Sequence, residues 1–415
     1  MSHAVLRLLM VVSLGVFFAS ELRGEWFSRR VYSEDFEGKF PANMPPDPSL
    51  PPRRNPISQV TPGGTSGSQH LDLMPGTKTD PAIAWTSLPF PVQIGRHYRL
   101  TFDAKTSAPF LWGVSFRDAQ GKPLNGDHNT GVEPCEDWTP QTFYFIGKYP
   151  GVEGSLSFYL LGPDAAAIDN ICIQPAVPSE ERAWYRQLAG QMPPIRVTSA
   201  DGAGKLIPRS LAKLSQRGPF RIVFFGDSIA NDISNSCLGD MLKDRYPKTN
   251  FEIRFAGRGG TSWMQNESYV AERVLANEPD LVILLAISND TSTMRDPLAR
   301  IVRKIRAGAP DAEVLLLTPH IFPSKRTVDP WEFGRLQRDI VLAVAETESV
   351  EVVDLAGIWQ SYLTASGKPP AWLLRDAVHM NERGRLLAAH AVMAHLAGGR
   401  HESADGREGA VHGKE

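Results

Sequence analysis

The sequence predicts a two-domain protein in which an all-β domain precedes an α/β domain with a parallel sheet. After residue 220, short apolar strands alternate with amphipathic helices. Before residue 175, short alternating strands are separated by Gly, Pro and Asp turns. The chain has 415 residues, which suffices for two domains with separate cores. Alternation of strand and helix requires right-handed crossovers, so helices should cover both faces of the parallel sheet.

The first 24 residues are predicted to be a secretory signal. They contain an early basic residue, an apolar run from Leu8 to Ala19, and then a polar end. The run is too short to cross a bilayer as a helix and is typical of the centre of a signal peptide. No small-x-small cleavage motif follows, so an uncleaved anchor is the alternative. We expect a secreted or periplasmic protein with no stable membrane span.

Residues 31–175 are predicted to form a β-sandwich. Alternating apolar and polar residues between turns are typical of short strands with one buried face. Trp85, Trp112 and Trp138 lie in this region and could either stack on sugar rings or fill the core of the sandwich. The expected strands are His97–Lys105, Phe110–Phe116, Gln141–Ile146 and Ser155–Leu161.

Cysteines are sparse in this chain. In an exported protein, Cys135 and Cys172 could pair within the β domain, and three free thiols are the alternative. Cys237 falls on an expected helix and is predicted to be a buried packing residue. No Cys/His arrangement has metal-ligand spacing, so we expect neither a catalytic metal nor another cofactor.

Residues 176–219 are predicted to link the domains through one short helix at Glu180–Leu188 and a stretch with Pro and Gly. Residues 398–415 are polar and aperiodic, which is typical of a disordered tail. The net charge is −2 and no basic cluster is present, so we expect no nucleic-acid partner.

Residues 220–397 are predicted to form a three-layer α/β/α sandwich around five parallel strands. The expected strands are Ile222–Phe225, Phe251–Ala256, Leu281–Ile287, Glu313–Thr318 and Val350–Leu355. The expected helices are Tyr269–Ala276, Leu298–Arg306, Trp331–Glu346 and Arg385–Leu396.

The first of these strands ends at Gly226-Asp227-Ser228. Open α/β sheets place their chemistry at the carboxyl ends of such strands. Gly226 permits a sharp turn, and Ser228 should then lie near a helix amino terminus, where free N–H groups favour a developing negative charge. The tripeptide is also ordinary turn chemistry. Asn231 and Asp232, one turn later, are interpreted as polar groups at the start of the helix.

The sequence Asp376-Ala-Val-His379 supplies a base for a serine nucleophile. Histidine suits proton transfer near neutral pH, and a carboxylate three residues earlier can hold one tautomer. A solvated Asp and a capping His are the alternative reading of this motif. His320 also follows a strand and is the rival base, although no carboxylate is close to it in sequence; we expect it to line the cleft instead.

Two further strand ends carry possible oxyanion donors. The strand Phe251–Ala256 runs into Gly259-Gly260, and the strand Leu281–Ile287 ends at Ser288-Asn289-Asp290. Ester cleavage places negative charge on the carbonyl oxygen, which requires preset donors. A glycine N–H or an asparagine amide can supply them, whereas ordinary turns are the simpler explanation of each motif.

In their order along the chain, four motifs together resemble the SGNH hydrolases, also called GDSL-type esterases, which have a flavodoxin-like fold. The motifs are Gly226-Asp227-Ser228, Gly259-Gly260, Ser288-Asn289-Asp290 and Asp376-Ala-Val-His379. The resemblance covers about residues 220–396. It implies that Ser228 is the nucleophile, that Gly260 and Asn289 are oxyanion donors beside the Ser228 amide, that His379 is the base, and that Asp376 orients it.

Two details qualify the resemblance. Gly260 is preferred to Gly259 because the family's glycine directly precedes a short polar pair, here Thr261-Ser262. The family usually has Gly-x-Asn-Asp, whereas Ile287 occupies the glycine position here. We expect Ile287 to narrow the acyl pocket or to shift Asn289.

The β domain resembles jelly-roll carbohydrate-binding modules at its opening, Glu34–Glu37, and its closing stretch, Ile168–Ile171. That resemblance implies a structural calcium ion held by Glu37 and Asp169, with ordinary surface carboxylates as the alternative.

These observations predict a secreted serine esterase that removes acyl groups, chiefly acetyl, from a carbohydrate or another small ester. The carbohydrate preference comes from the accessory domain and is an analogy at the level of the fold. An acyltransferase, a lipase or a thioesterase of the same fold are alternatives. A carbohydrate-binding protein with an inactive hydrolase domain is an alternative of a different class.

Overall fold

The structure is a computed structural model, which describes residues 31–34, 59–65, 69–74, 82–148, 152–197, 203–287, 291–323, 329 and 331–397. The expected signal, the expected tail, Glu37 and Asn289 lie outside these residues. The chain divides into two compact units. The first comprises residues 1–123 and 131–181, and the second comprises residues 124–130 and 182–415.

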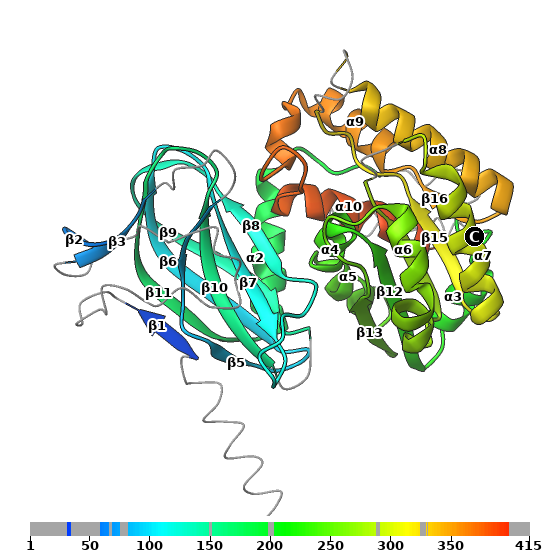
Figure 1. Ribbon diagram of the computed structural model, residues 1–415, viewed down its shortest axis with the longest axis horizontal. Coiled ribbons are helices and arrows are strands. Elements are labelled where there is room, and N and C mark those ends of the chain that lie inside the picture. Colours follow the sequence, from blue (N-terminus) through cyan, green and yellow to red (C-terminus); the bar gives the residue numbers. More distant parts are fainter. Residues whose placement is uncertain are drawn as a thin grey trace, which may run out of the picture. The chain divides into compact units, whose positions relative to one another are not determined.

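The first unit contains two antiparallel sheets (Figure 1). One has the order β2-β3-β11-β6-β9, with β1 paired to β11, and the other has the order β4-β10-β7-β8, with β5 paired to β10. The first sheet consists of β1 (Tyr32–Glu34), β2 (Gln59–Pro62), β3 (Gln69–Leu73), β6 (His97–Thr106), β9 (Cys135–Ile146) and β11 (Ala166–Ala176). The second consists of β4 (Ala82–Thr86), β5 (Phe90–Val92), β7 (Phe110–Arg117), β8 (His128–Val132) and β10 (Val152–Leu160), although residues 128–130 of β8 are counted with the second unit.

Aromatic residues fill the core between these two sheets. Trp112 is completely buried and Trp85 is 5% exposed, so the two are core residues rather than exposed sugar platforms. Phe102 and Phe158 meet edge to face with ring centroids 5.2 Å apart, an arrangement that aromatic rings prefer. Trp138, in contrast, is partly exposed.

The three cysteines are free thiols. Cys135 donates to the carbonyl oxygen of Ala104 at 3.3 Å, across the β6–β9 pair. Cys237 is buried, as the sequence predicts, and directly precedes helix α5 (Leu238–Arg245). The disulfide alternative for Cys135 and Cys172 is therefore wrong for this structure.

The second unit confirms the predicted parallel sheet of five strands, in the order β13-β12-β14-β15-β16. β14 is buried along its whole length, as is typical of a strand covered on both faces. The strands are β12 (Gly218–Gly226), β13 (Thr249–Phe255), β14 (Leu281–Leu285), β15 (Glu313–Leu317) and β16 (Glu351–Val353).

Helices cover both faces of this sheet (Figure 1). Alternate strand residues enter two separate cores: Ile222, Phe224 and Ile283 belong to one, and Val223, Phe225 and Leu284 to the other. The first core packs on α4 (Ser228–Ser234), α5, α9 (Leu355–Ser366) and α10 (Glu382–Leu396). The second packs on α6 (Trp263–Tyr269), the π-helix η1 (Val270–Val274), α7 (Arg295–Gly308) and α8 (Glu332–Glu348).

The chain before the sheet differs from expectation. The short helix predicted at residues 180–188 is the longer α2 (Pro178–Gln191), and α3 (Pro208–Leu214) was not predicted. The predicted helix at residues 269–276 consists of the end of α6, η1 and the 3-10 turn η2 (Leu275–Asn277). A second 3-10 turn, η3 (Pro370–Leu373), precedes the loop with His379.

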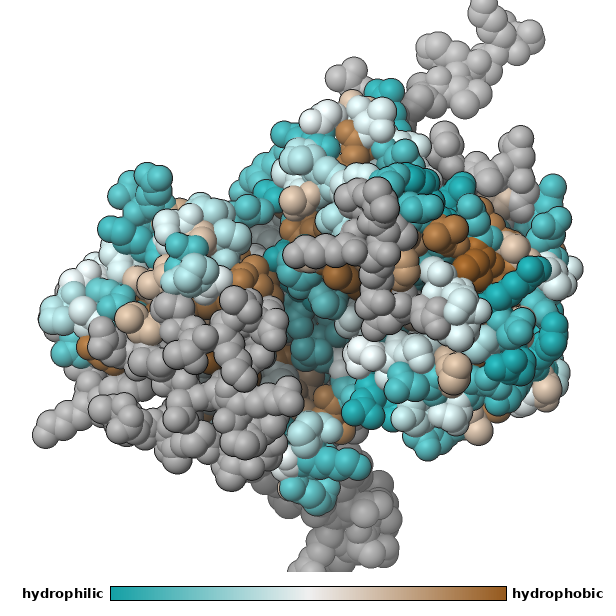
Figure 2. Space-filling model, turned by 45° about the horizontal axis from the view of Figure 1, so that its top comes forward, coloured by the Kyte–Doolittle hydropathy of each residue, from teal (hydrophilic) through white to brown (hydrophobic). Residues whose placement is uncertain are grey.

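The described residues on the face in Figure 2 are mostly hydrophilic. On the face in Figure 2, apolar residues form small groups separated by polar ones. Among the described residues, no helix combines the length and the apolar composition that crossing a membrane requires.

Candidate active site

The turn after β12 brings Ser228 to the carboxyl edge of the parallel sheet. Gly226 has φ 151°, and a Cβ atom there would lie 1.7 Å from the carbonyl oxygen of Leu285 on β14. Only glycine fits this close approach of two strands. Asp227 then caps helix α4 by accepting a hydrogen bond from Ile229 N at 2.9 Å. Ser228 is therefore the first residue of α4, where helix N–H groups are free.

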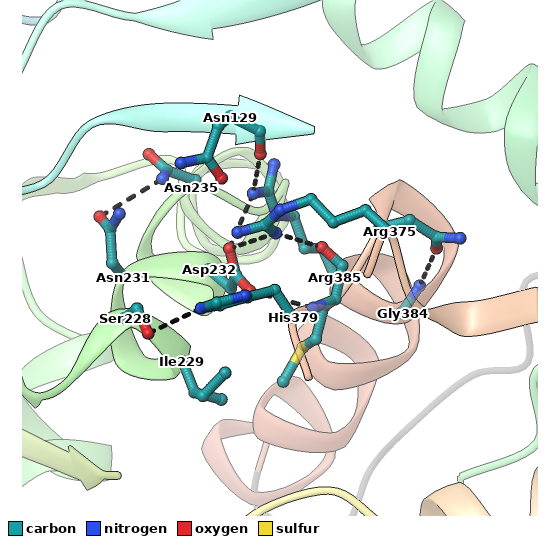
Figure 3. Close-up of polar contacts among 12 residues, drawn as sticks. Asn129, Ser228, Ile229, Asn231, Asp232, Asn235, Arg375, His379, Gly384 and Arg385 are labelled. Atoms are coloured by element: carbon teal, nitrogen blue, oxygen red, sulfur yellow. Dashed lines mark hydrogen bonds and ion pairs between the residues drawn. The ribbon is translucent and has the colours of Figure 1, made fainter. Parts of the chain in front are cut away.

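A chain of hydrogen bonds joins Ser228, His379 and Asp376. The Oγ atom of Ser228 lies 2.8 Å from Nε2 of His379, a residue 151 positions later (Figure 3). The Nδ1 atom of His379 lies 2.8 Å from Oδ2 of Asp376. The structure thus brings together the nucleophile, the base and the orienting carboxylate that the sequence predicts, at hydrogen-bond distances.

The Asp376 carboxylate is held by its own loop. Its Oδ1 atom accepts from the backbone N–H groups of Val378 at 2.8 Å and His379 at 2.7 Å. Burial raises the pKa of Asp376, but the hydrogen bond and the charge of His379, with the charge of Arg375, lower it further, so that the pKa lies well below its usual value. The carboxylate therefore stays ionised and accepts a hydrogen bond from the Nδ1–H group of His379, which leaves Nε2 without a proton and able to accept a hydrogen bond from Ser228.

His320 does not have the position of a base. It is completely buried and lies against Trp359, with ring centroids 4.8 Å apart. Its Nε2 atom is 2.7 Å from the carbonyl oxygen of Val378. Burial lowers the pKa of His320 to about 4, so the ring is neutral and donates this hydrogen bond. His320 thus supports the loop of His379, rather than lining an open cleft as the sequence predicts.

The turn with Gly259 and Gly260 lies beside Ser228. A Cβ atom on Gly259 would be 3.7 Å from the Cβ atom of Ser228, and Gly260 has φ 72°, a conformation that glycine adopts readily. The N–H of Arg258 donates to the carbonyl oxygen of Gly226 at 3.0 Å, which ties this turn to the nucleophile turn. Asn289 lies outside the described residues, so its side chain is not placed.

Ile287 is attached to the same turn. Its backbone N–H donates to Oδ2 of Asp227 at 2.8 Å, while Oδ1 of Asp227 accepts from Ile229. Burial raises the pKa of Asp227 to about 7, against the lowering effect of these two N–H groups. Asp227 therefore fixes the end of β14 relative to the first turn of α4.

Sequence reasoning missed a buried ionic group next to the triad. Asp232 was interpreted as a polar residue at a helix start, but its side chain is 1% exposed and lies between the side chains of Arg375 and Arg385 (Figure 3). Asp232 follows Ser228 by four residues and so shares a helix face with it. That spacing was the only signal in the sequence, because both arginines come more than 140 residues later.

Main-chain carbonyl groups from residues 124–130 complete this region. The carbonyl oxygen of Asp127 accepts from Nδ2 of Asn231 at 2.7 Å and from Nδ2 of Asn235 at 3.1 Å. The carbonyl oxygen of Asn129 accepts from Nη2 of Arg385. Asn231 is therefore a polar residue of the helix start, as predicted, and in addition a buried donor that holds this segment.

Comparison with known proteins agrees with this geometry. Residues 224–386 match the GDSL-like lipase/acylhydrolase family. The matched segment contains Ser228, Asp376 and His379. Comparison with curated proteins gave no match.

Three solved structures illustrate the structural likeness. A protein of Parabacteroides merdae described as a GDSL-like lipase is 15% identical, with 44% of this chain and 98% of that chain covered and a TM-score of 0.39. An acetylxylan esterase from Geobacillus stearothermophilus is 18% identical, with 44% and 96% covered and a TM-score of 0.38. The acetyl xylan esterase AlAXEase is 20% identical, with 42% and 98% covered and a TM-score of 0.38.

The family match falls on the α/β unit alone. Residues 224–386 therefore resemble a hydrolase domain of the GDSL type, and the match supports a carboxylic ester hydrolase.

Proposed function

We propose that the protein is an exported serine esterase that hydrolyses O-acyl esters, chiefly O-acetyl esters, on a carbohydrate. The observation that carries the reaction type is the hydrogen-bonded chain from Ser228 Oγ through the His379 ring to Asp376. Such a chain activates a hydroxyl group that is otherwise a weak nucleophile.

The reaction proceeds in two halves. Ser228 Oγ attacks the ester carbonyl while His379 Nε2 takes the hydroxyl proton, and the carbon–oxygen bond to the sugar breaks as that proton passes to the leaving oxygen. A water molecule then gives its proton to His379 and attacks the acyl-enzyme, which releases the acid and restores Ser228. The N–H groups of Ser228 and Gly260 and the amide of Asn289 would stabilise the oxyanion in both halves.

Replacing the nucleophile tests the reaction type. With 4-nitrophenyl acetate as substrate, we expect the Ser228→Ala variant to lose about 10³-fold or more in kcat. Ser268→Ala, at an exposed position on α6, is the matched control and should keep the wild-type rate. Equal rates for the wild type and Ser228→Ala would instead favour a protein that only binds carbohydrate.

The preference for a small acyl group rests on Ile287. This branched side chain is partly buried against the core and follows β14 directly beside Asp227. We expect acetate esters to be cleaved faster than butyrate esters, and Ile287→Gly to narrow that difference, because a smaller side chain leaves more room beside the nucleophile. An unchanged preference in the variant would assign the acyl pocket to other residues.

The carbohydrate preference rests on a pocket of about 550 Å³ in the β unit. Trp138 stands at its side and meets His70 edge to face, with ring centroids 5.3 Å apart. His70 is in turn 3.1 Å from the carboxylate of Asp72. An aromatic face next to charged hydrogen-bonding groups suits a sugar ring, which is apolar on its faces and polar at its edge. The pocket is lined in addition by Lys105, Glu136 and the small residues Ala165 and Ala167.

Substrate and binding assays test this assignment. Incubation with acetylated polysaccharides should release acetate from at least one of them. Trp138→Ala should weaken retention on that polysaccharide but leave the hydrolysis of 4-nitrophenyl acetate unchanged. Retention that does not depend on Trp138 would contradict a sugar site in this pocket.

Export rests on the apolar run near the amino terminus. Expression of the full chain with cell fractionation should place the esterase activity outside the cytoplasm. Activity confined to the cytoplasmic fraction would contradict export without affecting the proposed reaction.

A further inference from the structure

The buried carboxylate of Asp232 has no part in the triad, yet it lies one helical turn from the nucleophile. It is held in a cluster with Arg375, Arg385 and Glu382, whose side chains are at most 10% exposed. Two carboxylates and two guanidinium groups make this cluster neutral. Buried ion pairs of this kind are weak evidence for stability, because desolvation offsets much of the Coulomb attraction. Stabilisation of the fold alone therefore does not account for this cluster, and its contacts indicate a second role.

Both oxygen atoms of Asp232 are used. Oδ1 accepts from Nη1 of Arg375 at 2.7 Å and from Nη2 of Arg385 at 2.8 Å. Oδ2 accepts from the backbone N–H of Met380 at 3.0 Å. Arg375 and Met380 flank the segment that contains Asp376 and His379.

The same two residues close the loop at its base. Nη1 of Arg375 also donates to the carbonyl oxygen of Met380, and the backbone N–H of Arg375 donates to the carbonyl oxygen of His379 at 3.0 Å. A β-bridge joins Leu374 to Met380. The loop of residues 375–380 is thus a closed unit, and the Asp232 carboxylate attaches it to α4 in addition to the hydrogen bond between Ser228 and His379.

Charge keeps this attachment in place. Burial raises the pKa of Asp232, but Arg375 and Arg385 lower it more, so the carboxylate has a pKa below its usual value and remains ionised. Charge-assisted hydrogen bonds are shorter and stronger than neutral ones. A neutral residue at this position would remove the carboxylate that both guanidinium groups share, and Glu382 would remain as the ion-pair partner of Arg385.

We propose that Asp232 is a positioning residue for the reaction. Ser228 and Asp232 share helix α4, and Asp232 holds the loop of His379 by the two residues at its ends. Because Asp232 is on the same helix as Ser228, its carboxylate fixes the distance between Ser228 Oγ and His379 Nε2. The inference rests on the proposed roles of Ser228 and His379.

The test compares two substitutions within this cluster with a control that removes a buried carboxylate elsewhere in the same unit. Asp232→Asn removes the charge, and Arg375→Lys keeps the charge but removes the side chain that reaches both Asp232 and Met380. The matched control is Glu351→Gln. Glu351 is a buried carboxylate that accepts from the N–H groups of Gly204 and Leu206, and it lies at the amino end of β16, at the opposite edge of the sheet from Ser228.

Reaction with a fluorophosphonate reports the reactivity of Ser228 without any need for the natural substrate. We expect Asp232→Asn and Arg375→Lys to react about 10–100-fold more slowly than the wild type. With 4-nitrophenyl acetate, kcat should fall more than KM changes, because a displaced base weakens the stabilisation of the transition state more than the binding of the substrate. Glu351→Gln should lose stability but react at the wild-type rate. If Asp232→Asn does not fold, Arg375→Lys decides.

Two outcomes would overturn the inference: wild-type reactivity in the folded variants, or an equal loss in Glu351→Gln. A wild type that does not react would contradict the proposed function instead. In that case the NMR resonance of the His379 Nδ1 proton decides, because its chemical shift depends on the position of the ring and not on catalytic activity. A shift in Asp232→Asn but not in Glu351→Gln supports the inference, and unchanged spectra overturn it.

Discussion

At the scale of single residues, the Asp376 carboxylate has two separate tasks. One oxygen atom binds backbone N–H groups of its own loop, and the other binds Nδ1 of His379. The first fixes the carboxylate, and the second fixes the tautomer of the ring. A base can act on Ser228 only when its Nε2 atom carries no proton, so the second task is the one that matters for the proposed reaction.

An amide at position 376 should therefore abolish most of the activity. In Asp376→Asn the side chain keeps its shape but can present an N–H group to His379, which favours the wrong tautomer. We expect kcat for 4-nitrophenyl acetate to fall about 10⁴-fold while the protein remains folded. Asp339→Asn, at an exposed position on α8, is the control. A loss below tenfold would show that another group orients His379.

The sequence predicts the residues whose partners are local and misses those whose partners are distant. Asp376 and His379 are three positions apart, so their pairing can be inferred from spacing. Asp232 finds Arg375 and Arg385 only after 143 and 153 further residues have folded around it. No periodicity records such a contact, and a polar residue near a helix start is ordinarily exposed.

At the scale of elements, the end of β12 depends on one close approach. At Gly226 an added Cβ atom would meet the carbonyl group of Leu285 on the neighbouring strand, and φ is positive. Gly226→Ala should thus force β12 and β14 apart and cost about 3 kcal/mol or more in the free energy of unfolding. Denaturant titration measures this.

The matched control is Gly190→Ala on α2, where an added Cβ atom meets nothing within 4 Å. This variant should be neutral or slightly more stable, because alanine favours helix. Equal stabilities of the two variants would contradict the assigned strain at Gly226.

Helix α10 begins with a buried charge that makes stability depend on pH. Burial raises the pKa of Glu382, but the charge of Arg385 and contacts to His128 and Tyr185 lower it further, to about 2. A carboxyl group with a depressed pKa stabilises the fold when ionised. Its contribution is complete above about pH 4.5 and is lost as the pH falls toward 2.

Glu382→Gln should therefore be less stable than the wild type by about 3 kcal/mol at pH 6, and the difference should shrink as the pH approaches 3. Unfolding free energies from urea titrations at several pH values measure the difference. The exposed Glu346 on α8 supplies the control, since Glu346→Gln should differ from the wild type by a constant amount. A difference independent of pH at Glu382 would contradict its depressed pKa.

Helices and strands could be predicted from the sequence where apolar residues lie on one face of the element or fill it entirely. All five parallel strands follow from short apolar runs, and α7 follows from its amphipathic spacing. Helix α9 was missed because its sequence LAGIWQSYLTAS is apolar on most sides and lacks a clear period. The strands β2 to β5 and β8 were missed because they have only three to five residues each, too few to show alternation.

At the scale of the whole molecule, the hydrolase unit is discontinuous in sequence. Residues 124–130 lie far upstream but belong to the compact unit formed by residues 182–415. The sequence gives no sign of this, since Asn125-Gly126-Asp127 is an ordinary turn between two strands. Their backbone carbonyls nevertheless accept the hydrogen bonds of Asn231, Asn235 and Arg385.

A chain that begins at residue 182 should therefore be impaired, although it contains the whole triad. It lacks the acceptors for three buried donors, one of them charged, which together are worth about 3–5 kcal/mol. We expect its melting temperature to fall by about 10 °C relative to the same unit in the full protein. Its reaction with a fluorophosphonate should slow as well, because Arg385 also binds Asp232.

Joining residues 124–130 to residue 182 through a flexible linker should restore part of both losses, since the segment would again reach its donors. A chain beginning at residue 182 that matches the full protein in both measurements would show that water replaces these carbonyls without cost, and the hydrolase unit would then be independent of the upstream segment.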